Sequence, residues 1–142
     1  MASAAVVAAV QDKLAANWTH TPIIQPNAAS LVPDDGSAFL VLEFPPVGGE
    51  NQITIGAQGT RVFREDGAFL LTLCAPLGTG VNPTATPWLT WLDALRAAFR
   101  GQAFAGVNTL GASPAYENGA SDRGAFFELS TAIPFYLDLS NG

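Results

Sequence analysis

Hydrophobic and polar residues alternate most regularly near the end of the chain. From residue 125 to residue 138, apolar side chains occupy every second position, with mostly polar ones between them. A period of two is typical of a β-strand with one face in the core. Pro134 has no backbone N–H, so this strand is expected either to lie at a sheet edge there or to have a partner that ends earlier. The predicted core face consists of Ala125, Phe127, Leu129, Thr131, Ile133, Phe135 and Leu137.

Two other segments repeat their apolar residues at helical spacing, and the first lies near the start of the chain. This helix is expected to follow Ser3, which can cap it, and to end near Asn17. Residues 19–26 should then be extended, because Pro22 and Pro26 each bias the preceding residue away from helix. The expected core side of the helix is formed by Val6, Val7, Val10 and Leu14.

The second predicted helix has ends that are marked by capping residues. Thr86 is the expected N-cap, Pro87 should occupy the first helical position, and Gly101 should follow the last turn. The apolar stripe of this helix is expected to pack on one face of the sheet. It is formed by Trp88, Trp91, Leu92, Leu95 and Phe99.

Shorter apolar segments predict further strands. Residues 37–44 are apolar on both faces, as in a central strand. Residues 45–51 interrupt the pattern with Pro and Gly, and residues 52–55 are expected to form a short strand. Residues 104–110 could pair briefly, whereas residues 111–124 have the composition of a polar loop.

Residues 60–74 predict a β-hairpin. Residues 60–64 and 68–74 would be its strands, and Glu65-Asp66-Gly67 would be its turn. Gly67 suits the left-handed position after a type I turn, which produces a G1 bulge. A two-residue loop at Asp66-Gly67 is the alternative, and it would shift the register by one residue and exchange the two faces.

Together these elements predict an α+β fold. It is an antiparallel sheet of four to five strands with two helices, the second of which packs on one face of the sheet. Strands and helices do not alternate along the chain as a parallel βαβ fold requires. Residues 1–142 contain no internal repeat and no long linker, so they are expected to form a single domain.

The composition predicts a surface that carries little charge. Charged residues make up 13% of the chain, and hydrophobic residues make up 49%. Ordinary soluble domains are about a quarter charged. Two interpretations stay open: apolar surface that is covered by a partner, or an Ala- and Gly-rich chain whose small residues raise the hydrophobic count.

The net charge of −6 argues against a sequence-specific nucleic-acid partner, because binding to phosphates needs clustered Lys and Arg. No apolar run has the length of a membrane span. Residues 4–10 resemble the apolar part of a signal peptide, but no positive segment precedes them and Gln11-Asp12-Lys13 follows at once. A soluble, intracellular protein without a membrane partner is therefore expected.

Residue types that usually carry catalysis are scarce. His20 is the single histidine and is expected to be an exposed or locally hydrogen-bonded loop residue; Cys74 is the single cysteine and should be buried in a strand. The segment Leu77–Val81 lacks the Lys of a phosphate-binding loop and is interpreted as a connector. A facing carboxylate pair of Glu43 and Glu128, as in a glycosidase, stays open as an alternative. We expect no catalytic, cofactor-binding or metal-binding residue, no cofactor, and no enzymatic activity.

The charged residues of the predicted hairpin are the main candidates for contact with a partner. Arg61 and Arg64 precede its turn, and Glu65 and Asp66 lie within it. They could form a solvated tip with ion pairs worth under about 1 kcal/mol. Alternatively, they could form a projecting contact with a neighbouring subunit, which we favour because charge on a low-charge chain concentrates specificity.

The order of these elements resembles the tail terminator proteins of long-tailed bacteriophages and of phage-derived particles such as gene transfer agents. The resemblance covers nearly the whole chain, from the N-terminal helix and the extended Pro-rich connector to the terminal strand. It consists of element order and local pattern. The residues that carry it are Phe39–Leu42, Ile53–Gly56, Arg61–Arg64, Gly67, Phe69–Leu73, Pro76–Gly80, the amphipathic helix and Ile133–Tyr136.

The resemblance implies a structural virion protein at the head–tail junction, made in the cytoplasm of a bacterial host. Such a subunit forms a six-membered ring on the end of the tail tube, stops tube polymerisation and provides the surface that joins the head. Its partners would be other copies of itself, the tail tube protein and the head–tail connector or neck protein. The family has no catalytic residues. By position, the expected ring and tube contacts are residues 61–69 and 45–51, in particular Arg61, Arg64, Glu65, Asp66, Gly67, Gly48 and Gly49.

Two alternatives stay open. The chain could be another neck, tail-completion or tail tube protein of similar fold. It could instead be a small-molecule-binding α+β domain with a pocket between the second helix and the sheet.

Overall fold

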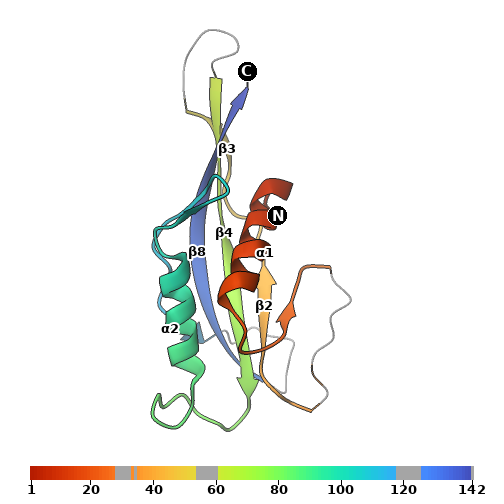
Figure 1. Ribbon diagram of the computed structural model, residues 1–142, viewed down its shortest axis with the longest axis vertical. Coiled ribbons are helices and arrows are strands. Elements are labelled where there is room, and N and C mark those ends of the chain that lie inside the picture. The colour runs from red at the N-terminus through yellow and green to blue at the C-terminus, as the bar shows by residue number, and fades with distance from the viewer. Residues whose placement is uncertain (28–32, 34, 54–60, 118–125, 142) are drawn as a thin grey trace.

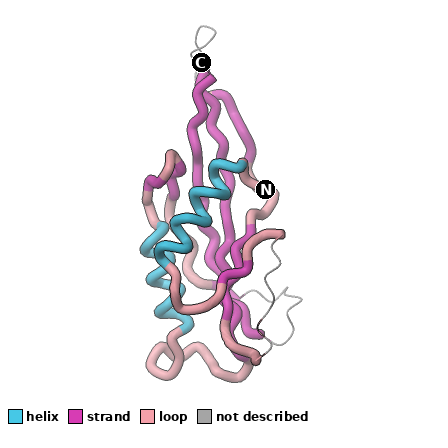
Figure 2. The backbone as a smooth tube through the Cα atoms, turned by 45° about the vertical axis from the view of Figure 1, so that its right-hand side comes forward, coloured by secondary structure: helices cyan, strands magenta, loops and turns pink. Residues whose placement is uncertain are grey.

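The computed structural model describes residues 1–27, 33, 35–53, 61–117 and 126–141. It shows an open sheet with two helices on one of its faces (Figures 1 and 2). The α+β class and the two helices are thus confirmed. The elements are α1 (Ala4–Asn17), β1 (Ile23–Ile24), β2 (Phe39–Glu43), β3 (Gly49–Gln52), β4 (Arg61–Pro76), α2 (Trp88–Phe99), β5 (Ala103–Phe104), β6 (Val107–Thr109), β7 (Tyr116–Glu117) and β8 (Phe126–Asn141).

Within the described residues the sheet has eight strands, which is more than the four to five predicted. The main path is β1-β2-β4-β8-β6-β5, while β3 pairs with β4 and β7 pairs with β8. All pairs are antiparallel except β1 with β2, which is parallel, so the sheet is mixed. The prediction missed β1 and β7, because a segment of two residues cannot display a period of two.

The predicted hairpin at Glu65-Asp66-Gly67 is wrong. Residues 61–76 form one continuous strand, β4, which pairs with β8 from Arg61 opposite Asn141 to Pro76 opposite Phe126. The sixteen consecutive cross-strand pairs between β4 and β8 outweigh a local turn signal over three residues. On the other side of β4, β3 pairs with residues 63–66 and adds to this effect. The choice between two turn registers therefore does not arise.

Glycine is needed at positions 48 and 67 because β3 and β4 approach closely there. Gly48 has φ +84°, and a Cβ on it would overlap the carbonyl group of Asp66. A Cβ on Gly67 would lie 3.0 Å from the carbonyl oxygen of Val47 and 3.2 Å from the Phe135 ring. Gly67 thus marks a close approach inside a strand, not a turn.

The second helix differs from its prediction by about one residue at its start. Pro87 occupies the N-cap position, and the Thr86 hydroxyl donates to the Asn82 carbonyl oxygen at 3.3 Å, so Thr86 does not cap the helix. At the other end, Arg100 is the C-cap and Gly101 follows with φ +58°, as expected of a glycine after a last turn.

Both helices pack on the same face of the sheet, which confirms the predicted placement of the second. The first helix has the expected bounds, although the side chain of Ser3 at its N-cap forms no capping hydrogen bond. The two helices share one core cluster with the sheet face that bears Phe69, Leu71 and Leu73. The buried helical residues of this core are Val6, Ala9, Val10, Leu14, Leu92, Leu95 and Phe99.

Three tryptophans and the histidine form a partly exposed aromatic cluster beside that core. The rings of His20 and Trp91 stack with centroids 4.4 Å apart, and Trp18 and Trp88 meet Trp91 edge-on at 6.0 and 5.4 Å. His20 is exposed, as predicted, whereas Trp91 is only half-buried. The two tryptophans of the second helix, Trp88 and Trp91, therefore close the rim of the core instead of filling it.

The opposite face of the sheet is more buried than the sequence predicted. The terminal strand was expected to have a mostly polar outer face, yet Glu128 and Ser130 are buried there. Thr72 and Ser130 share a hydrogen bond of 2.8 Å between their hydroxyls, and the burial of Cys74 is confirmed. A second, smaller cluster on this face consists of Phe39, Val41 and Cys74.

Pro134 lies where the partner strand ends, which is one of the two predicted arrangements. On the side away from β4, β6 stops with Thr109 opposite Phe135, and β7 begins with Tyr116 opposite Ser130. The missing N–H of Pro134 therefore falls in the gap between two short strands, and its carbonyl oxygen still accepts from the Leu110 N–H at 3.0 Å.

The shorter predicted segments have mixed outcomes. The brief pairing in residues 104–110 is confirmed as the β5–β6 hairpin, whose turn residues Ala105 and Gly106 both have positive φ. The polar loop over 111–124 contains β7, and the rest of it, from residue 118, lies outside the described residues. The short strand predicted over 52–55 is displaced to Gly49–Gln52, and residues 54–60 also lie outside the description.

Replacing Gly48 with Ala should destabilise the protein more than the same change at Gly80, which has φ +76° but open space where a Cβ would lie. Gly80→Ala should cost about 1 kcal/mol for the left-handed backbone alone. Gly48→Ala should cost about 1–3 kcal/mol more, because β3 must move away from β4. Urea denaturation of both variants measures the difference, and equal losses would show that the close approach is absent.

Leu95→Ala should cost about 2–5 kcal/mol, since Leu95 is 2% exposed in the core. Trp91→Ala should cost less, about 1–2 kcal/mol, because its main loss is the aromatic contacts at the rim. The same unfolding assay compares the two variants. A larger loss for Trp91→Ala would mean that the aromatic cluster belongs to the core.

Candidate functional site

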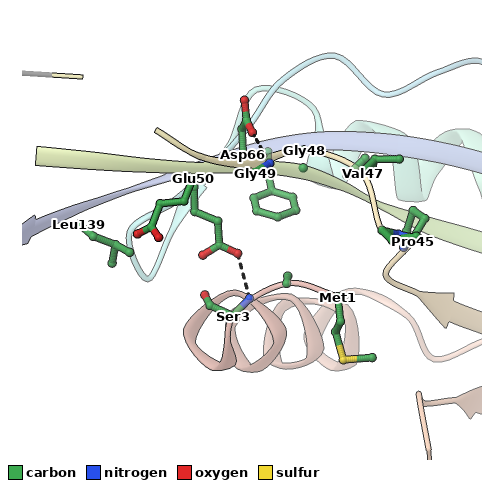
Figure 3. A pocket seen from close by; sticks show the side chains of 15 residues that line it. Met1, Ser3, Pro45, Val47, Gly48, Gly49, Glu50, Asp66 and Leu139 are labelled. Atoms are coloured by element: carbon green, nitrogen blue, oxygen red, sulfur yellow. Dashed lines mark hydrogen bonds between the residues drawn. The ribbon is translucent and has the colours of Figure 1, made fainter. Parts of the chain in front are cut away.

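A groove of about 480 Å³ separates the start of α1 from the upper part of β4 (Figure 3). The loop 45–48 and β3 form its other walls. Five of the seven residues expected at a subunit interface line this groove, although they reach it from a continuous strand and not from a hairpin. They are Gly48, Gly49, Glu65, Asp66 and Gly67.

Two carboxylates hold the walls of the groove together. Glu65 accepts a hydrogen bond of 2.9 Å from the backbone N–H of Ser3, which fixes the start of α1 to β4. A carboxylate at a helix N-terminus is also favoured by the helix dipole. Asp66 points to the other side of the strand and accepts from the Gly49 N–H at 2.9 Å, which fixes β3 to β4 (Figure 3). Both residues therefore position the groove.

Arg64 and Arg61 do not line the groove. Arg64 lies on the opposite face of β4 from Glu65, and its guanidinium makes two hydrogen bonds, of 2.7 and 3.0 Å, to the Asp138 carboxylate. The same guanidinium lies over the Tyr136 ring at 4.2 Å. The hydrogen bonds from Arg64 hold the pKa of Asp138 below its ordinary value and raise the pKa of Arg64. Arg61 is exposed and is the first residue of β4.

Glu50 lines the groove and belongs to the segment 45–51 that was expected to contact a partner, although it was not among the residues named individually. It is exposed on β3 and stands directly opposite Glu65 in the β3–β4 register. Like charges in that position repel each other. No Lys or Arg is found among the described residues that line the groove, so the charged side chains of its lining are acidic. In the sequence, Glu50 is recognisable only as an acidic residue that follows a segment rich in Pro and Gly. Its position opposite Glu65 depends on the fold.

Exposed apolar side chains gather around the same groove. Met1, Val47 and Leu139 line it with exposed fractions of 74%, 55% and 39%. Ile53, 45% exposed, directly follows β3. These residues account for four of the eight large exposed hydrophobic side chains in the described part of the chain. Apolar surface that gathers at one place is typical of a contact site.

The other candidates for chemistry lie apart. Glu43 and Glu128 share a face, but two strand steps and four residues separate them, roughly 16 Å, which is too far for a glycosidase pair. In the connector 77–81, Thr79 accepts a hydrogen bond from the Trp88 indole at 3.0 Å, and α2 begins at Trp88. The described residues contain no group of three or more side chains that could hold a metal ion. The groove is not the predicted pocket between the second helix and the sheet, since none of its lining residues comes from α2.

No protein-family model matches this sequence, and no curated protein matches it. None of the helices in the described ranges has the length and apolarity needed to cross a membrane.

The Arg64–Asp138 pair should make stability depend on pH in the acid range. The native pKa of Asp138 lies below its unfolded value of about 3.9, so the pair stabilises the protein above that pH. This contribution is lost as pH falls through the native pKa. Arg64→Met should therefore reduce the free energy of unfolding most above that pH and least in strong acid.

Urea denaturation over a pH series measures this difference, with Asp138→Asn in the Arg64→Met background as the control. The second change should add little, because the pair is already broken. A loss in Arg64→Met that does not vary with pH would assign the effect of Arg64 to its contact with the Tyr136 ring.

Proposed function

We propose that this chain is a structural subunit of a long-tailed phage or gene transfer agent, namely a tail terminator. In this role it forms a six-membered ring on the end of the tail tube, stops tube polymerisation and provides the surface that the head connector joins. The observation that carries the proposal is the open edge of β3, with its apolar and acidic groove, at the projecting end of the sheet.

The open edge supports a role in assembly. All four residues of β3 are exposed, and within the described residues this strand pairs with β4 alone. The ends of β4 and β8 project beyond α1 at the top of Figure 1. An unpaired strand edge offers backbone N–H and C=O groups to another chain, and β3 has no Lys or Pro to prevent such pairing. Closed ring symmetry would cover every such edge.

The element order gives further support. An N-terminal helix, an extended connector, a central strand, an amphipathic helix and a long terminal strand follow one another as in the family that the sequence resembles. The continuous β4 replaces the expected hairpin and keeps Glu65, Asp66 and Gly67 beside the groove. Contacts with the tail tube and the connector would then involve the projecting strands, and no cofactor is needed.

A ligand-binding domain is the second candidate, because the volume of the groove falls in the usual range for small-molecule sites. Such sites present polar groups that converge on the ligand. Here Glu65 and Asp66 already accept backbone hydrogen bonds within the protein. The groove therefore suits a contact between proteins better than a site for a small polar ligand.

The proposal predicts that the purified protein forms closed rings with a lumen as its concentration rises, or when isolated tail tubes are added. Size-exclusion chromatography with light scattering gives the mass, and negative-stain electron microscopy shows the rings and whether they sit on tube ends. A protein that stays monomeric and ignores tube ends would refute the proposal. Rings that do not bind tube ends would favour a neck protein of similar fold.

A further inference from the structure

The two sides of the sheet differ in charge. On the β3 side, the groove carries two carboxylates, those of Glu50 and Glu65. The other end of the main strand path is β5, which lies beyond β8 and β6. Near β5 lie two cations, Lys13 and Arg100. The acidic and basic surfaces therefore belong to opposite edges of one sheet.

The basic edge has one exposed cation, Arg100, and one half-buried cation, Lys13. The Lys13 ammonium lies 5.2 Å from the centre of the Phe104 ring in β5, and 5.9 Å from that of Phe99. Arg100 is the exposed C-cap of α2, only three residues before β5. The ion pairs found in the described residues are Arg64–Asp138 and Arg96–Asp93, so neither Lys13 nor Arg100 takes part in one. β5 itself pairs only with β6 in this part of the chain.

The acidic edge, by contrast, favours a cation from outside. Glu50 and Glu65 stand opposite each other, and Figure 3 shows the Glu50 side chain pointing into the groove. Their repulsion would be relieved by a basic side chain placed between or beside them. The exposed Val47 and Leu139 would be covered by the apolar part of the same partner.

We propose that the groove beside β3 in one copy receives the β5 edge of a second copy. Glu50 and Glu65 of the first copy face Arg100 and Lys13 of the second, and Val47 and Leu139 meet Phe104. This contact rests on the proposed ring, because it joins two different edges of the same protein and so repeats from copy to copy until a ring closes. Opposite charge on the two edges also sets their orientation and speeds their encounter.

Charge exchange between the two edges tests the contact. Glu50→Lys alone and Arg100→Glu alone should each raise the concentration needed for ring assembly by at least about tenfold, because each variant places like charges across every interface. An equimolar mixture of the two variants should restore rings. In the mixture, the lysine introduced at position 50 of one protein meets the glutamate introduced at position 100 of the other, and the remaining interfaces keep the native pair. Light scattering and electron microscopy measure assembly, and circular dichroism checks folding.

Glu117→Lys is the matched control: Glu117 is exposed on β7, and this change should leave assembly as in the wild type. Wild-type rings that are insensitive to Glu50→Lys and Arg100→Glu would overturn this contact while the proposed ring stands. Variants that lose rings but are not restored by mixing would mean that the groove receives a different basic partner. A wild-type protein that forms no ring, with or without tail tubes, would overturn both proposals.

Discussion

The pairing of β4 with β8 is the constraint on which the rest of the structure depends. These two strands face each other over sixteen residues, and every other strand except β1 and β5 pairs directly with one of them. The ladder runs through a Glu-Asp-Gly sequence that favours a turn, and it holds those residues extended. It also provides the face on which both helices bury their apolar sides. The groove exists because this ladder continues past the end of the helices.

Strict alternation along β4 decides where each charge lies. Arg64 and Asp66 point to one face, whereas Glu65 points to the other. Arg64 therefore meets Asp138 across the strands, while Glu65 reaches the start of α1. Three consecutive charged residues thus perform three separate tasks: pairing the two long strands, anchoring a helix and anchoring β3. A hairpin turn at this point would have placed all three at one exposed tip.

Long, periodic segments were mostly predictable from the sequence, whereas β1 and β7 were not. The first helix, the core face of the terminal strand and the stripe on the second helix follow from repeats that local propensity reinforces. The continuous course of β4 could not be predicted, because its cause is the partner strand β8, about 65 residues further along the chain. The groove depends on Gly48 approaching Asp66 and on Glu50 facing Glu65, and both follow from a pairing register that no local pattern contains.

The like-charged pair at the groove offers a way to limit which chains can pair with an open strand edge. An uncharged edge beside exposed apolar residues would pair with many extended chains. Two carboxylates facing each other in β3 and β4 make that edge repel acidic partners, and a chain with a net charge of −6 repels its own copies in most orientations. An orientation that brings Arg100 and Lys13 to the groove escapes this repulsion. In the proposed contact, the repulsion between Glu50 and Glu65 within each subunit is relieved only by the basic edge of a second copy. This repulsion therefore restricts assembly to the head-to-tail contact from which a ring can close.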